Sequence, residues 1–298
     1  MLTVLLGLGS ALGYVLHDYL MVKVVRSVAV WTAMCWSMGF GMLVLVPLAL
    51  VLHGLPSGTA QWHAVAWAMA GGLCEAAALA CLLRGLVTGN LSIVTPLASL
   101  AGGIVAVIAV AGGESLAAPA MIGLPLAVAG GLLASIEKAP AEGVLGVADG
   151  GDTDADEPPP RRRGTAGAGW ALLSSALFAV VILLLDQATA LPSVSIAACG
   201  RLGTMAVLIP VTLLLGGLRL PREYVRRCGL AGVADATGFV LFAAAIIIGP
   251  LAVASVVISQ GGTMAVLLGY VALRERLSKV QYVGVACTIV ACTLFALN

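Results

Sequence analysis

Two carboxylates and one arginine interrupt long apolar stretches of this chain, where charged side chains are rare. Glu75 lies in WAMAGGLCEAAALACLL, Asp235 in CGLAGVADATGFVLF and Arg201 in AACGRLGTM. An ionised side chain in hydrocarbon costs about 2.5 kcal/mol or more, so a carboxyl there favours its protonated form. A second carboxyl close by strengthens that preference. The chemistry these residues predict is proton exchange near neutral pH, in competition with a cationic molecule.

Arg201 is open to three interpretations. It could pair with Glu75 or Asp235, bind the carboxylate of a substrate, or extend its guanidinium to the membrane interface. A substrate carboxylate would indicate amino or organic acids, whereas pairing would weaken the case for a cationic substrate. The structural alternative for the two carboxyls is that each stays protonated and hydrogen-bonds a neighbouring helix.

The elements that carry these residues belong to a membrane protein. Of 298 residues, 61% are apolar and 10% are charged, and the mean hydropathy is +1.10. Soluble domains have roughly a quarter of their residues charged. The apolar runs are continuous and lack the period-two alternation of a membrane β-barrel. The net charge of +1 indicates no nucleic-acid partner.

The apolar runs predict an all-α integral membrane protein with ten transmembrane helices. Each run is long enough for the roughly 20 residues that span a bilayer. The predicted spans are 2–22, 28–52, 62–83, 88–111, 117–136, 167–187, 193–218, 228–248, 250–273 and 280–297.

A polar stretch divides these helices into two sets of five. Residues 137–166, with DGGDTDADEPPPRRRGTAG, have the proline, glycine and charge content of a disordered linker. The acidic spacing in it does not fit a calcium loop, because glycine and glutamate are missing where that loop needs them. The predicted repeats are therefore 1–136 and 167–298.

The two sets align as an internal duplication. SALGYV in the first resembles SALFAV in the second. At an offset of 160, Gly89 in TGNLSIVTPLASL matches Gly249 in IGPLAVASVVISQ (249 − 89 = 160). The same offset places Glu75 on Asp235 (235 − 75 = 160). We therefore expect the two carboxylates to face each other between the repeats.

The basic residues predict how the repeats sit in the membrane. All but Arg201 fall on odd-numbered connections between predicted spans, and the positive-inside rule makes those connections cytoplasmic. Both termini are then outside the cytoplasm, and repeats of five helices have opposite orientations. Inverted repeats recur in secondary transporters, with the binding site near the midplane. The residues on odd connections are Lys23, Arg26, Arg84, Lys138, Arg161, Arg162, Arg163, Arg219, Arg222, Arg226, Arg227, Arg274, Arg276 and Lys279.

The second repeat also resembles a known family. The stretch GPLAVASVVISQGGTMAVLLGYVALRERLSKVQYVGVACTIVAC resembles the EamA-like repeat of the drug/metabolite transporter superfamily, with Glu275, Gln281 and Gly284 at the family's positions. The first repeat is similar more weakly, with Glu114 in place of Glu275. Relatives are often drawn with cytoplasmic termini, whereas the charges of this chain indicate the reverse, which we follow.

The resemblance implies a transporter that moves a small organic solute, such as a metabolite, amino acid or drug, by alternating access. We expect export across the cell membrane, coupled to protons through Glu75 and Asp235. No Walker A motif is present, and we expect no cofactor, catalytic residue or metal site. The expected partners are the solute and the lipid bilayer. The sequence also leaves open whether the protein forms a homodimer.

Two other functions compete with solute transport. A flippase for a lipid or lipid-linked carrier would use the same fold, and a lateral opening for an acyl chain would favour it. An integral-membrane enzyme would need clustered Asp, His or Arg at one membrane face, and the sequence shows no such set.

Further polar residues are candidates for a place in the site or for a structural role. Gln260 and the following glycines interrupt the ninth predicted span where Pro96 interrupts the fourth, and matching breaks indicate backbone that lines a cavity. Gln260 is thus a candidate substrate or coupling residue. His17 and Asp18 lie near the end of the first span, where interfacial anchoring or a place at a pore mouth would explain them. Glu114 is interpreted as structural.

Overall fold

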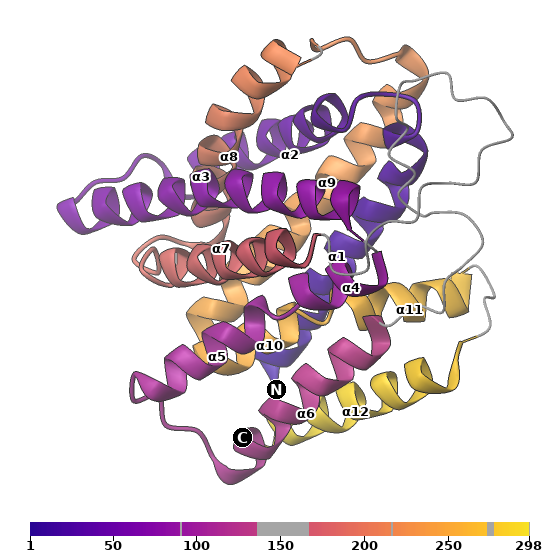
Figure 1. Cartoon of the computed structure of the whole chain (residues 1–298). Helices are drawn as coiled ribbons and strands as arrows, with labels where there is room; N and C mark the ends of the chain where they lie inside the picture. The colour runs from indigo at the N-terminus through magenta and orange to yellow at the C-terminus, as the bar shows by residue number, and fades with distance from the viewer. Residues whose placement is uncertain (90, 136–166, 216, 273–276, 298) are drawn as a thin grey trace, which may run out of the picture.

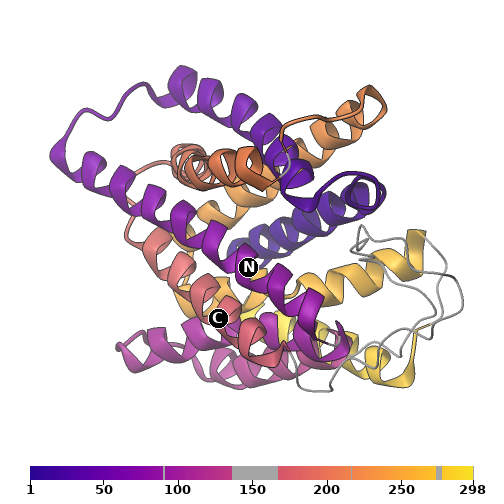
Figure 2. The ribbon, with the colours of Figure 1, turned by 45° about the horizontal axis from the view of Figure 1, so that its top comes forward.

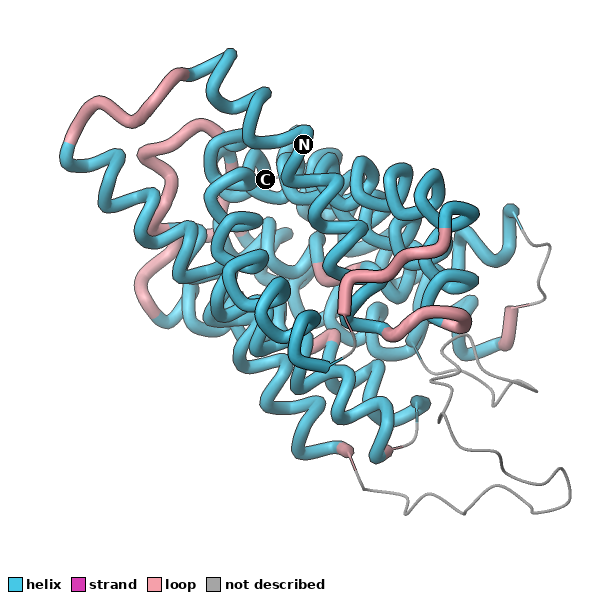
Figure 3. Tube along the Cα trace, turned by 90° about the horizontal axis from the view of Figure 1, so that it is seen from above, coloured by secondary structure: helices cyan, strands magenta, loops and turns pink. Residues whose placement is uncertain are grey.

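The fold is helical throughout the part of the chain that can be described. The computed structural model describes residues 1–89, 91–135, 167–215, 217–272 and 277–297, and every regular element in them is an α-helix (Figure 3). This confirms the all-α class predicted from composition. The linker predicted at 137–166 and the glutamate at 275 lie outside these residues.

Twelve helices are observed, and they account for the ten predicted spans. They are α1 (Leu2–Val25), α2 (Val30–His53), α3 (Thr59–Thr88), α4 (Leu91–Ala98), α5 (Ala101–Ala111), α6 (Ala118–Ser135), α7 (Ala168–Asp186), α8 (Ser193–Leu215), α9 (Arg222–Ile248), α10 (Leu251–Ile258), α11 (Gly261–Ala272) and α12 (Lys279–Ala296).

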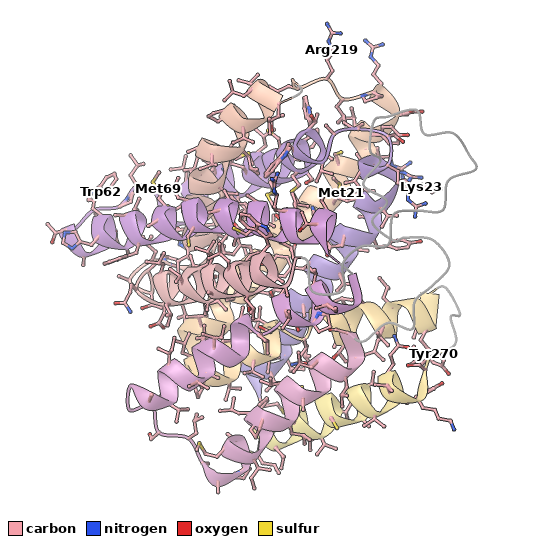
Figure 4. All side chains as sticks on the ribbon, in the orientation of Figure 1. Met21, Lys23, Trp62, Met69, Arg219 and Tyr270 are labelled. Carbon is pink, nitrogen blue, oxygen red and sulfur yellow. The ribbon has the colours of Figure 1, made fainter. Side chains whose placement is uncertain are left out.

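Nine segments of the described residues are long and apolar enough to cross a membrane, and α10 with α11 counts as one of them. A shorter apolar segment, Pro96–Ala111, includes α5. The chain is therefore a multi-pass membrane protein. Trp62 and Lys23 lie at opposite ends of the bundle, as expected for residues near the two ends of membrane-spanning helices (Figure 4).

The fourth and ninth spans are broken at corresponding places, as the sequence predicts. The first break separates α4 from α5 at residues 99–100, and the second separates α10 from α11 at residues 259–260, again an offset of 160. At the first break, the hydroxyl of Ser99 donates to the carbonyl of Pro96 at 2.8 Å. Proline has no backbone N–H, so it weakens the helix at this turn.

The largest helix contacts recur when the two five-helix sets are exchanged. The most extensive contacts join α1 to α9 and, correspondingly, α7 to α3. Likewise, α3 packs on α8 as α9 packs on α2. Two further pairs, α2 with α8 and α6 with α12, match themselves, and the contact of α5 with α10 joins the fourth span to the ninth. Figures 1 and 2 show α6 and α12 at one edge of the bundle and α2 and α8 at the other.

The ends of α3 and α9 repeat the same local structure. Gly89 ends α3 with extended backbone angles, φ −121° and ψ −180°, and its N–H donates to Gly85. Gly249 ends α9 with φ −127° and ψ 175°, and its N–H donates to Ala245. The glycines aligned by sequence therefore close equivalent helices in the same way. These two helices carry the paired carboxylates.

Candidate functional site

Arg201 joins the two intramembrane carboxylates. Its Nη1 donates to both oxygens of Glu75, at 2.9 Å to Oε1 and 2.8 Å to Oε2. Its Nη2 donates to Oδ1 of Asp235 at 2.8 Å. Glu75 comes from α3, Arg201 from α8 and Asp235 from α9, so one guanidinium ties three helices together. Of the three arrangements open from sequence, the structure shows pairing, and with both acids.

The cluster is largely closed to the outside. The side chain of Arg201 is 0% exposed, that of Asp235 is 3% exposed and that of Glu75 is 13% exposed. The hydroxyl of Thr204 donates to Oε2 of Glu75 at 2.7 Å. Thr204 follows Arg201 by three residues, which places both on one face of α8. That spacing is the signal by which the sequence could have identified this residue.

An aromatic ring and a thioether complete the surroundings of the guanidinium. The carbon Cζ of Arg201 lies 4.5 Å from the ring centroid of Phe239, one turn after Asp235 on α9. The sulfur of Met38 on α2 is 4.0 Å from Nη1. A guanidinium over an aromatic face is attracted by the ring quadrupole. These contacts hold the charged plane of Arg201 in one orientation between the acids.

The cluster carries uncompensated charge and unused hydrogen-bonding groups. With both acids ionised, one positive and two negative charges sum to −1. Two buried atoms of the cluster have no hydrogen-bond partner among the described residues: Oδ2 of Asp235 and Nε of Arg201. A buried net charge and an unpaired carboxylate oxygen are both costly. Binding one proton or one monovalent cation would remove the net charge.

Two glycines let the helices come close enough to form this cluster. A Cβ atom at Gly72, one turn before Glu75, would collide with the carbonyl of Gly200 on α8. A Cβ atom at Gly232, one turn before Asp235, would collide with the carbonyl of Ser37 on α2. The same backbone contact therefore precedes each carboxylate.

This contact shows which residues of α2 and α8 correspond. Ser37 takes the place of Gly200, so the next residues, Met38 and Arg201, occupy matched positions. The acids are paired between the two halves, but the arginine has an uncharged counterpart. The asymmetry leaves one basic group to serve two carboxylates, which is why the cluster keeps a net negative charge.

Gln260 lies away from the charged cluster of Glu75, Arg201 and Asp235. Its Nε2 donates to the carbonyls of Ala127 at 3.1 Å and Val256 at 3.2 Å. Its Oε1 accepts from Thr263 at 3.2 Å and Thr288 at 3.0 Å. The residue is 2% exposed at the break between α10 and α11, packed against α6 and α12. The structure does not bring Gln260 together with the charged cluster.

Glu114 lies at the turn between α5 and α6. Its Oε2 accepts the backbone N–H of Ala252 at 2.9 Å, in the first turn of α10. A carboxylate at a helix N-terminus accepts an otherwise unpaired N–H and is favoured by the helix dipole. The contact agrees with the structural role expected from sequence.

The described residues contain no group of three or more His, Cys, Asp and Glu side chains that could hold a metal ion. A groove of about 330 Å³ opens between α1, α11 and α12, away from the charged cluster. Apolar side chains line most of it, with hydroxyls from three threonines. The lining residues are Leu8, Thr263, Met264, Leu267, Thr288, Ile289, Cys292, Thr293 and Ala296.

The second five-helix set matches a known family. Residues 165–297 match the EamA-like transporter family. The match agrees with the resemblance to the drug/metabolite transporter superfamily seen in the sequence. Within the matched residues lie Arg201, Asp235 and Gln260, whereas Glu75 lies in the first set.

The fold of the chain resembles that of a solved structure. A crystal structure of another protein, 15% identical in sequence, matches with a TM-score of 0.73 and covers 99% of this chain and 96% of its own. At that identity the likeness concerns the fold alone. No curated protein matched the chain.

Proposed function

We propose that this protein is an EamA-like transporter that exports a small organic solute by alternating access, and that proton exchange at the Glu75–Arg201–Asp235 cluster drives the export. The observation that carries the proposal is the bridge of one guanidinium between two carboxylates inside the membrane-spanning bundle. Ionisable residues in such positions are expensive and mark transport or proton pathways.

Asp235 is the group we assign to proton exchange. Glu75 accepts three short hydrogen bonds from Arg201 and Thr204, and these leave neither of its oxygens unpaired. Asp235 has one bond from Arg201 and an unpaired, buried Oδ2. A proton on Oδ2 neutralises the cluster while the bond at Oδ1 persists. A cationic solute would compete for the same uncompensated charge.

Alternating access follows if the two five-helix sets, 1–136 and 167–298, are inverted repeats. Three observations support the duplication: the exchangeable pattern of helix pairs, the matched breaks and the matched glycine caps. A guanidinium that joins α3 to α8 and α9 links helices of both sets. Protonation weakens that link and lets the sets move relative to each other.

The orientation proposed from charge puts both termini outside the cytoplasm of the cell membrane. This orientation is supported by the basic residues near the ends of α1 and α3, between α8 and α9, and at the start of α12. The proposal needs one chain only, and a homodimer is a separate question.

A ligand screen tests the proposal. The thermal unfolding temperature of purified protein is measured with amino acids, polyamines, nucleosides and cationic drugs, for wild type and for the Glu75→Gln, Asp235→Asn double variant. We expect a compound that raises the unfolding temperature of wild type alone. The Asp186→Asn variant, at the end of α7, is the matched control and should respond as wild type does. A compound that stabilises both proteins equally would move the site away from the cluster.

Lipid translocation is the second candidate, and the groove between α1, α11 and α12 favours it. A mainly apolar groove of about 330 Å³ on a membrane-spanning bundle offers room for part of an acyl chain. Vesicles with fluorescent phospholipids of different headgroups would distinguish the two. Headgroup-selective translocation that is lost when Thr288→Leu fills the groove would favour the flippase. Solute movement that this variant leaves unchanged would favour export.

A further inference from the structure

A line of polar side chains runs along α1 beside the charged cluster. Ser10, Tyr14 and His17 are spaced by four and three residues, so they share one face of the helix. That face packs on α9, where a Cβ atom at Gly238 would meet the backbone of Ser10 and Tyr14. Tyr14 interacts electrostatically with all three members of the cluster. The Ser10–His17 face of α1 therefore borders the cluster.

His17 is the ionisable imidazole of this line. The residue is 7% exposed and both ring nitrogens have partners. Nδ1 lies 2.9 Å from Oδ1 of Asp18, and Nε2 lies 3.2 Å from the hydroxyl of Ser37 on α2. A neutral imidazole donates from one nitrogen and accepts at the other, so it can take up a proton on one side and release one on the other.

Asp18 gives this imidazole a connection to the outside. Its side chain is 78% exposed, against 9% for His17. It lies seven residues before the end of α1, or about 10 Å at the rise of an α-helix. An exposed carboxylate is too costly among acyl chains, so Asp18 marks the level that headgroups or water reach. The basic residues at this end, Lys23 and Arg26, assign it to the cytoplasmic face.

The other side of the imidazole contacts the hydroxyl of Ser37, which donates to the carbonyl of Met34 at 3.2 Å. Ser37, the partner of Nε2, contacts α9 at Gly232, and Gly232 precedes Asp235 by three residues, a rise of about 4.5 Å. His17 and Asp235 interact electrostatically. The charged groups that act on His17 are Asp18 from α1, Asp235 from α9 and Arg201 from α8, while α2 contributes the uncharged Ser37.

We propose that Asp18 and His17 carry protons between the cytoplasmic surface and Oδ2 of Asp235. The proposal rests on the proton exchange assigned to Asp235 above. A proton taken up by Asp18 passes to Nδ1 of His17. The imidazolium releases a proton from Nε2 to the hydroxyl of Ser37, which turns from the carbonyl of Met34 towards Asp235 and gives up one proton as it gains another. The carboxylate of Asp235 receives it at Oδ2, and Asp18 and His17 return to their starting charges.

Infrared spectroscopy of the full-length protein in lipid nanodiscs tests this relay with protons and deuterons as the only ligands. The carbonyl band of the protonated Asp235 carboxyl is assigned by its loss in Asp235→Asn. Its deuteration rate is then followed after transfer into deuterium oxide. We expect His17→Gln to slow deuteration about a hundredfold, the lower end of what a positioned proton-transferring side chain contributes. Asp18→Asn should also slow it.

Two controls keep the result interpretable. His53→Gln changes an exposed histidine at the end of α2 and should leave the rate at the wild-type value. Imidazole in the buffer should restore fast deuteration to His17→Ala, which a purely structural role of His17 would not allow. An unchanged rate in His17→Gln overturns the relay alone. If wild type shows no Asp235-dependent band at any pH, the proton exchange proposed as the function fails as well.

Discussion

Arg201 and Met38 occupy matched positions on α8 and α2, and the guanidinium Nη1 of one lies 4.0 Å from the sulfur of the other. Around them the two acids, Glu75 and Asp235, are also matched. One half of the bundle thus supplies a charge that the other half lacks. An asymmetric centre in a nearly symmetric bundle allows the two acids to have different roles, one held by bonds and one free to exchange.

Arg201→Met should strongly destabilise the protein, because it leaves two carboxyls in a closed site without a counter-charge. Removing one partner of a buried ion pair costs about 3–5 kcal/mol. The triple variant Arg201→Met, Glu75→Gln, Asp235→Asn should recover most of that loss, because no charge remains. Denaturant unfolding in detergent measures both. Arg84→Met, at an exposed position near the end of α3, is the control. Equal stability of the single and triple variants would contradict the role of Arg201 as counter-charge.

Glu75→Gln should cost more stability than Asp235→Asn, although each removes one negative charge. Glu75 accepts three charge-assisted or hydroxyl bonds, whereas Asp235 accepts one and leaves Oδ2 unpaired. Hydrogen bonds to charged groups contribute about 1.5–3 kcal/mol each. We expect a difference of about 2 kcal/mol between the two variants in the same unfolding experiment. A greater loss for Asp235→Asn would reverse our assignment of the two acids.

Gly72→Ala and Gly232→Ala should each separate the helices that form the cluster. Either added methyl group meets the backbone of the facing helix. Overpacking of this kind costs about 1–3 kcal/mol. Gly229→Ala lies on α9 with nothing within 4 Å of the added atom, and we expect it to be neutral or slightly stabilising. The helix contacts proposed for the cluster would be wrong if all three variants unfolded alike.

Glu114→Gln should loosen the start of α10. The side chain then loses the charge that favours its place at the helix N-terminus, at a cost of about 1 kcal/mol. Hydrogen exchange read by mass spectrometry should show faster exchange in residues 251–258 and unchanged exchange in α12. Glu223→Gln, in the first turn of α9, is the control for the loss of an exposed carboxylate. Unaltered exchange at 251–258 would show that the capping contact does not hold the helix.

The sequence predicted the helical class and the spans because an apolar run of this length leaves the backbone no other way to satisfy its hydrogen bonds in lipid. The offset of 160 placed Glu75 and Asp235 at equivalent positions of α3 and α9, and in the structure both acids bind Arg201. It did not show that Arg201 lies between them. That depends on which faces of α3, α8 and α9 meet, and the close approach at Gly72 and Gly232 decides it.

Gln260 shows the limit of the same reasoning. Its place at a helix break was predicted, but the position of a break in the sequence does not determine the direction of the side chain. The helix packing places Gln260 against α6 and α12, and two carbonyls and two threonines from α6, α10, α11 and α12 occupy all of its hydrogen-bonding positions. Thr204 was missed for the converse reason. A threonine in an apolar helix is common, and its spacing of three residues from Arg201 becomes informative only with its contact to Glu75.

The most direct test of proton coupling uses proteoliposomes and the compound that the ligand screen returns. Wild type and the Glu75→Gln, Asp235→Asn double variant are compared in two assays: exchange of labelled compound at equal pH, and accumulation driven by a pH gradient. We expect wild type to perform both. The double variant should keep exchange at equal pH and lose the response to the gradient, because neither amide side chain can bind or release a proton. Gradient-driven accumulation at the wild-type level in the double variant would contradict proton exchange at this cluster.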